Sequence, residues 1–142
     1  MSPGQPIHAT TVAVRRRGAW QGVMILGPSG AGKSDLALRL IGRGWRLVSD
    51  DYTQVWASDG TVHASAPASI AGRIEVRGLG IVAARTRPVC RVALVVACAA
   101  EGVERLPEPQ TRAFAGIDLP LLELDPRPAS AVDVVAAALE TL

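Results

Sequence analysis

The sequence predicts an α/β nucleotide-binding domain with a phosphate-binding loop and a mixed β-sheet. Three observations indicate this fold: a glycine-rich motif between an apolar run and a run of helical periodicity, a hairpin pattern before that motif, and a composition that is 49% hydrophobic but only 4% aromatic. Cores of Val, Leu, Ile and Ala are typical of parallel strands covered by helices. The length of 142 residues fits one compact domain, so we expect a single domain over residues 1–142.

The first expected element is a hairpin. Residues 7–14 are rich in β-branched side chains and are joined through an Arg-Gly turn to a second strand over residues 20–26. An antiparallel pair before the motif differs from a plain alternation of strand and helix, and it predicts a mixed sheet. His8 lies on the first strand, where a lone histidine is more often structural than catalytic.

The phosphate-binding motif follows the second strand. Residues 27–34 fit the pattern G-x-x-x-x-G-K-[ST] at each fixed position, and apolar residues then recur at helical spacing. Backbone amides and the helix N-terminus of such a loop bind a polyphosphate, the lysine reaches the outer phosphates, and the serine hydroxyl can ligate Mg²⁺. The predicted phosphate-binding residues are Gly27, Pro28, Ser29, Gly30, Ala31, Gly32, Lys33 and Ser34.

Two adjacent carboxylates come after the next expected strand. The helix should end near residues 42–44, and the short strand after it leads to Asp50 and Asp51. Both carboxylates should lie at the sheet edge where the phosphate loop opens. One can hold Mg²⁺ while its neighbour accepts a proton from an attacking hydroxyl. The alternative is a polar turn, and the position beside the loop favours the functional interpretation.

Residues 73–81 form a second polar segment. Period-two alternation places Ile74 and Val76 on one face of a strand and Glu75 and Arg77 on the other. A carboxylate and a guanidinium on one face, followed by Gly-x-Gly, suit a site for metal and phosphate. A surface salt bridge beside a turn is the alternative.

The remaining elements are structural. We expect a hairpin around Asp59-Gly60, a central apolar strand over residues 89–97, a loop over residues 101–110, and short strand segments around Pro120. A last helix should begin at a Ser130 cap with Asp133 three residues later. Cys90 and Cys98 should be reduced, because an extended chain between them would separate them by about 26 Å.

Composition also narrows the class of protein. A net charge of +2 does not indicate nucleic-acid binding. No run approaches the ~18 apolar residues of a membrane helix, and the first residues lack the pattern of a secretory leader. We therefore expect a cytoplasmic protein without a membrane or nucleic-acid partner.

Several segments together resemble the HPr kinase/phosphorylases, specifically their catalytic C-terminal domain. The resemblance implies a fold like the nucleotide-binding domain of phosphoenolpyruvate carboxykinase and ATP-dependent phosphorylation of a serine of the phosphocarrier protein HPr, with Mg²⁺. It also suggests a homo-oligomer, specifically a hexamer. The segments that carry it are the phosphate loop, Asp50-Asp51, residues 74–81 with the family signature L-E-x-R-G-x-G-I, Leu119-Pro120, and Pro126-Arg127-Pro128.

The resemblance assigns a role to each candidate residue. Lys33 would bind the β and γ phosphates, and Asp50 would take the proton from the seryl hydroxyl. Ser34 would serve the metal together with Asp51 or Glu75. His8 matches the histidine of the family's first strand and becomes a catalytic candidate, which would orient or neutralise charge together with Arg77.

Departures from the family leave alternatives open. Residues 1–142 resemble only the catalytic domain of longer members, so we expect the short alphaproteobacterial form that lacks an N-terminal domain. The segment before the strand at Val89 is shorter than usual, so that Arg85 or Arg87 would have to replace a loop arginine, and the reverse phosphorylase reaction stays open. The other functions considered are an ATP-sensing regulatory module and a small-metabolite kinase. The Asp50 carboxylate argues against a bare sensor, and the lack of a lid segment argues against a metabolite kinase.

Overall fold

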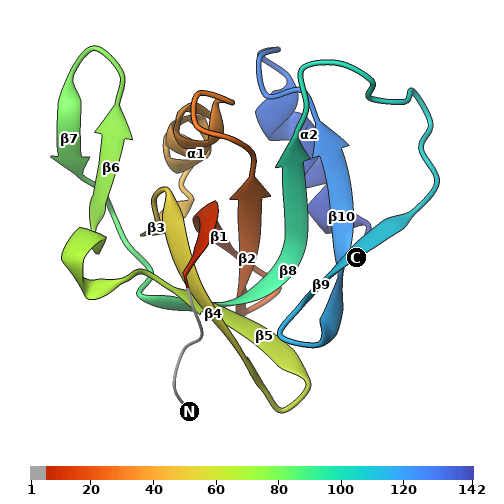
Figure 1. Ribbon diagram of the computed structural model, residues 1–142, viewed down its shortest axis with the longest axis horizontal. Coiled ribbons are helices and arrows are strands. Elements are labelled where there is room, and N and C mark those ends of the chain that lie inside the picture. Colours follow the sequence, from red (N-terminus) through yellow and green to blue (C-terminus); the bar gives the residue numbers. More distant parts are fainter. Residues whose placement is uncertain (1–5) are drawn as a thin grey trace.

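The structure, a computed structural model, describes residues 6–142 as a twisted mixed sheet with two α-helices on one face (Figure 1). Residues 1–5, on which the expectation about a leader partly depends, lie outside the described part. Within residues 6–142, no helix combines the length and apolar character needed to cross a membrane. The elements are β1 (Ile7–Arg16), β2 (Ala19–Leu26), α1 (Lys33–Ile41), β3 (Arg46–Ser49), β4 (Tyr52–Ser58), β5 (Thr61–Ser65), a 3₁₀ turn (Ala68–Ile70), β6 (Arg73–Val76), β7 (Gly80–Ala83), β8 (Val89–Cys98), β9 (Gln110–Phe114), β10 (Ile117–Leu124) and α2 (Ala131–Glu140).

The main sheet is mixed, as the hairpin pattern predicts. Its strands lie in the order β3, β1, β2, β8, β10 and β9. β2, β8 and β10 are parallel, whereas β1 is antiparallel to both β2 and β3. β2 and β3 therefore run in the same direction and end at the same edge of the sheet. The phosphate loop follows β2 and the Asp-Asp pair follows β3, so both lie at this edge.

The β4–β5 hairpin closes part of the sheet into a ring. β4 pairs with the start of β1, and β5 pairs with the start of β8. β8 joins both parts because its start pairs with β5 and its end pairs with β10. Its register against β2 shifts at Ala93, which has no partner there. Such a β-bulge bends a strand and reverses its side-chain alternation. Val92 and Val95, on either side of the bulge, consequently face the same core.

The two expected hairpin turns are confirmed. Arg17 and Gly18 join β1 to β2 with φ of 51° and 78°, and Asp59 and Gly60 join β4 to β5 with φ of 52° and 73°. Two successive residues with positive φ form the turn whose twist matches that of paired strands. The Arg-Gly and Asp-Gly pairs therefore set the register of both hairpins.

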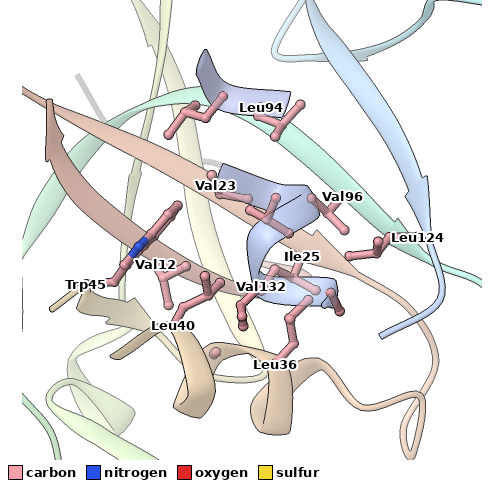
Figure 2. Packing of buried hydrophobic residues seen from close by; sticks show 14 of the residues in the cluster. Val12, Val23, Ile25, Leu36, Leu40, Trp45, Leu94, Val96, Leu124 and Val132 are labelled. Atoms are coloured by element: carbon pink, nitrogen blue, oxygen red, sulfur yellow. The ribbon is translucent and has the colours of Figure 1, made fainter. Parts of the chain in front are cut away.

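Each face of the sheet has its own hydrophobic core. On one face, Val23 and Ile25 of β2 pack with Leu36 of α1 and Val132 of α2 (Figure 2). Met24, between the two β2 residues, faces the core inside the ring. Side chains alternate along a strand, so one strand contributes to both cores. This packing holds β2 and α1 together on either side of the phosphate loop.

The segment over residues 73–81 differs from the single strand that the alternation predicts. β6 and β7 form an antiparallel hairpin, and Arg77 lies in its turn just after β6 ends. Gly78 and Gly80 have φ of 85° and 119°, so these glycines reverse the chain here. Within β6 the expected alternation is confirmed, with Ile74 buried and Glu75 exposed.

Two expectations for the C-terminal part are wrong. Pro120 does not interrupt the strand, because β10 pairs with β8 only from Leu121 onward, after the residue that lacks an N–H group. α2 begins directly after Ser130, as predicted, but the Ser130 side chain makes no cap hydrogen bond. Asp133 bonds instead to Arg43 at 2.6 Å, which links α2 to the segment after α1.

Both cysteines are free thiols, as expected. Burial raises the pKa of Cys90 to about 12. Burial also raises the pKa of Cys98, while the nearby charge of Lys33 acts in the opposite direction. Both thiols therefore resist ionisation, and their role in the fold is packing.

Replacing Ile74 with alanine should lower the free energy of unfolding by ~2 to 5 kcal/mol, because the side chain fills a core. Ile74 is 1% exposed and packs in the core beneath α1, whereas Ile81 on the paired strand is 72% exposed. Ile81→Ala is the matched control and should change stability by about 0.5 kcal/mol or less. Urea unfolding followed by tryptophan fluorescence measures both, and equal losses would contradict the packing described.

Candidate active site

The phosphate loop connects the end of β2 to the start of α1. Gly32 precedes α1 in a left-handed conformation with φ of 100°, and no side chain caps the helix. The first N–H groups of a helix lack intrahelical partners, so they are available to an anion at this end. A Cβ on Gly32 would lie 3.3 Å from Pro126 Cγ, which also explains why the position needs glycine.

Lys33 begins α1, and its amine is folded against the loop. The side chain is 5% exposed, and Nζ donates a hydrogen bond to the Pro28 carbonyl at 3.1 Å. Pro28, Ser29 and Gly30 are themselves exposed. The loop is therefore an open cradle with a single buried cation at its base, a suitable arrangement for a polyphosphate.

Asp50 is a buried carboxylate at this edge of the sheet that bonds to three different elements. It is 8% exposed, and its carboxylate accepts three hydrogen bonds. Oδ1 accepts from the Ser34 hydroxyl at 2.6 Å and from the Thr10 hydroxyl at 3.1 Å, and Oδ2 accepts from the Glu75 backbone N–H at 3.0 Å. A carboxylate offers about four acceptor positions, so one position on Oδ2 stays available.

Thr10 was not among the residues selected from the sequence. It is fully buried, and its hydroxyl also accepts the Asp51 backbone N–H at 3.0 Å. Period-two alternation could have identified it, because it follows His8 by two residues on the same face of β1. The long-range pairing of β1 with β3 and β4, which the sequence does not reveal, places it beside the two carboxylates.

Asp51 points away from Asp50 and pairs with His8. Its Oδ1 lies 2.7 Å from His8 Nε2, and the His8 ring stacks on Tyr52 at 5.2 Å between centroids. Asp51 has φ of 68°, an uncommon conformation for a residue other than glycine. The backbone thus sends adjacent carboxylates to different partners, Asp50 to the phosphate loop and Asp51 to the histidine. Among the described residues, no three His, Cys, Asp or Glu side chains gather as a metal site.

Glu75 and Arg77 lie at the rim. Glu75 contacts the site through its backbone N–H to Asp50, while its side chain is exposed. Arg77 is exposed, and its guanidinium makes no hydrogen bond or ion pair with the rest of residues 6–142. The structure therefore brings the β6 backbone to Asp50 and leaves both side chains free.

Neither candidate for the loop arginine lies at the phosphate loop. The Arg87 guanidinium stacks over Trp20 at 5.0 Å, at the start of β2 and thus at the opposite end from the loop. Arg85 lines a hollow of about 420 Å³ beside the end of α1. A second hollow, of about 410 Å³, lies at the start of β8, beside β10. Both hollows are away from the residues of the loop.

Comparisons with known proteins agree on one family. A family model described as the HPr serine kinase C-terminal domain matches residues 1–139. A Bacillus licheniformis relative named HPr kinase/phosphorylase is 34% identical over 95% of this chain and 46% of its own length. A Clostridium botulinum relative of the same name is 43% identical over 58% of this chain and 26% of its own length. The chain therefore spans less than half of these curated relatives.

Among solved structures, the chain is similar to that of the Hpr(Ser) kinase/phosphatase from Coxiella burnetii. The TM-score is 0.81 at 23% identity, and the match covers 97% of this chain and 95% of that one. At 23% identity, this similarity is evidence for the fold. It confirms the predicted α/β class with a mixed sheet.

Proposed function

This chain belongs to the family of HPr serine kinase C-terminal domains, and from that premise we propose that it is an ATP-dependent protein serine kinase acting on an HPr-like phosphocarrier. The observation that carries the proposal is the contact between Asp50 and the phosphate loop, with Ser34 Oγ at 2.6 Å from Asp50 Oδ1. This contact supports the proposal because it holds a candidate proton acceptor against the phosphate loop, where a transferred phosphoryl group would bind.

The loop fits a nucleoside triphosphate with a magnesium ion. Its glycines adopt positive φ, the α1 amides are uncapped, and the Lys33 amine lies under the loop. A bound Mg²⁺ would supply positive charge that offsets the charge of the phosphates. Ser34 and the Glu75 carboxylate are our proposed protein ligands, with Asp51 as the alternative that its pairing with His8 makes less available. Hydroxyl and carboxylate oxygens are the donors that Mg²⁺ prefers.

Each candidate residue at this edge of the sheet has a role in the proposed reaction. The amides of the loop and the Lys33 amine bind the β and γ phosphates. Asp50 accepts the proton of the acceptor's seryl hydroxyl as that oxygen bonds to the γ phosphorus and the bond to the ADP oxygen breaks. His8 and Arg77 are proposed to balance charge, His8 through Asp51 and Arg77 from the open rim.

The test uses labelled ATP, Mg²⁺ and a cognate HPr protein, followed by mapping of the phosphorylated residue. Label on an HPr serine supports the proposal. ATP binding without transfer would favour an ATP-sensing module, and transfer only to a small metabolite would favour a metabolite kinase. Adding inorganic phosphate to phosphorylated HPr tests the reverse reaction at the same site.

Glu75→Gln should raise the Mg²⁺ concentration needed for half-maximal transfer, on the order of tenfold or more, because a neutral amide replaces a charged metal ligand. Arg77→Ala should instead lower turnover at an unchanged Mg²⁺ requirement. Mg²⁺ titrations of initial rate separate the two effects. Glu104→Gln, on an exposed loop, is the control. Normal Mg²⁺ dependence and normal turnover in both site variants would contradict a role of the β6–β7 hairpin in the reaction.

A further inference from the structure

Thr10 is a buried polar side chain that has no role in the reaction as proposed above. It is 0% exposed, and its hydroxyl donates to Asp50 Oδ1 at 3.1 Å while accepting the Asp51 N–H at 3.0 Å. We propose that Thr10 is a positioning residue that holds the two adjacent acidic residues in their separate orientations. This inference rests on the proposed function, in which Asp50 accepts the seryl proton.

The position requires a group that donates and accepts at the same time. A hydroxyl has one donor hydrogen and two acceptor lone pairs, and it can serve a carboxylate and a backbone N–H together. Valine has nearly the same shape but does neither. Thr10→Val would leave the Asp51 N–H without its partner and remove one of two bonds to Asp50 Oδ1. Asp50 could then rotate about its remaining contacts.

The conformation of Asp51 gives the contact its importance. Asp51 has φ of 68°, which is costly for a side-chain-bearing residue and persists only when its surroundings hold it. The bond from its N–H to Thr10 is one such constraint. Two further contacts hold the pair of carboxylates: His8 Nε2 lies 2.7 Å from Asp51 Oδ1, and the Glu75 backbone N–H bonds to Asp50 Oδ2.

The adjacent threonine provides a matched control. Thr11 is equally buried and faces the ring, where its hydroxyl lies 2.9 Å from that of Thr53. Thr53 in turn donates to the Ala9 carbonyl at 2.9 Å. Thr11→Val therefore removes a buried hydroxyl from the same strand without touching either carboxylate.

We expect Thr10→Val to lower kcat for phosphotransfer on the order of 10- to 100-fold, the effect of losing a hydrogen bond to a charged group, with the KM for ATP within a few-fold of the parent. Thr10→Ser, which keeps the hydroxyl, should restore most of kcat. Thr11→Val should keep kcat near the parent value. Steady-state kinetics at saturating Mg²⁺ measures all three. The proposal would be overturned if Thr10→Val had the same kcat as Thr11→Val, or if Thr10→Ser did not restore kcat.

A second measurement does not depend on activity. Thr10→Val should shift the urea midpoint less in an Asp50→Ala background than in the parent, because the bond between the two side chains is then already lost. If the two substitutions shift the urea midpoint additively, Thr10 does not position Asp50, whether or not the protein is an active kinase. If the shifts are not additive and the protein lacks kinase activity, the positioning role holds and the proposed function is rejected. If the valine variant does not fold, Thr10→Ala takes its place in both measurements.

Discussion

Asp50→Asn should slow phosphotransfer to the protein acceptor on the order of 10² to 10⁴-fold, the usual range for a lost general base. Asparagine keeps the size of the side chain, and its carbonyl oxygen can still accept from Ser34 and Thr10. Its amide nitrogen, however, would face the Glu75 N–H, which now bonds to Oδ2. The variant therefore loses basicity and one backbone contact but keeps the phosphate loop. ATP·Mg²⁺ should bind within a few-fold of the parent affinity.

Calorimetric binding and single-turnover transfer on the same preparation decide this prediction. A parallel loss of nucleotide affinity and rate would make Asp50 a metal ligand instead of a base. An undiminished rate would move the base elsewhere, with Asp51 the next candidate. Asp59→Asn is the control, since Asp59 is an exposed turn residue and asparagine suits the same turn.

Lys33→Ala should lower the rate at least ~100-fold, because the lost charge stabilises the transition state by roughly 3 kcal/mol or more. Lys33 is the single lysine of the chain and lies buried against the loop. Alanine also removes apolar stem atoms, so Lys33→Met, which keeps the length without the charge, is the matched variant. Both should show the same kinetic loss, and the methionine variant should keep the parent's unfolding midpoint.

The single lysine allows a direct measurement of binding at this position. Apart from the chain's amino terminus, an amine-reactive reagent can label only Lys33, and mass spectrometry locates the label. ATP should protect Lys33 from labelling in the parent protein. Full labelling in the presence of saturating ATP, or a Lys33→Met variant with near-normal rate, would remove the phosphate-loop interpretation.

Local patterns predicted much of the fold. Apolar alternation and turn pairs such as Asp59-Gly60 specify hairpins within a few residues, and the phosphate loop carries its strand and helix with it. The pattern also predicted that Asp50 and the loop meet at one edge, since this needs only the direction of neighbouring strands. The pattern does not decide whether Asp50 or Asp51 accepts the proton, and the roles of the site residues are predictions.

Contacts between distant strands were beyond the sequence pattern. Nothing local indicates that β5 pairs with the start of β8, or that Ala93 forms a bulge there. The contacts of Thr10 have the same origin, because its partners lie 40 and 41 residues away. The hairpin at Arg77 differs from the prediction for another reason: Gly-x-Gly suits both a phosphate site and a chain reversal, and here the positive φ values of Gly78 and Gly80 turn the chain.

The closed ring of strands also limits how this sheet can associate with others. Within the described chain, β9 has β10 as its one strand neighbour in the large sheet, so its outer backbone groups are unpaired. A further strand would pair with β9, which itself lies three strand positions from β2 and the phosphate loop. β9 is short and carries a charged Arg112, features that discourage edge-to-edge aggregation. Substitutions on β9 should therefore change self-association without changing the proposed nucleotide binding at the loop.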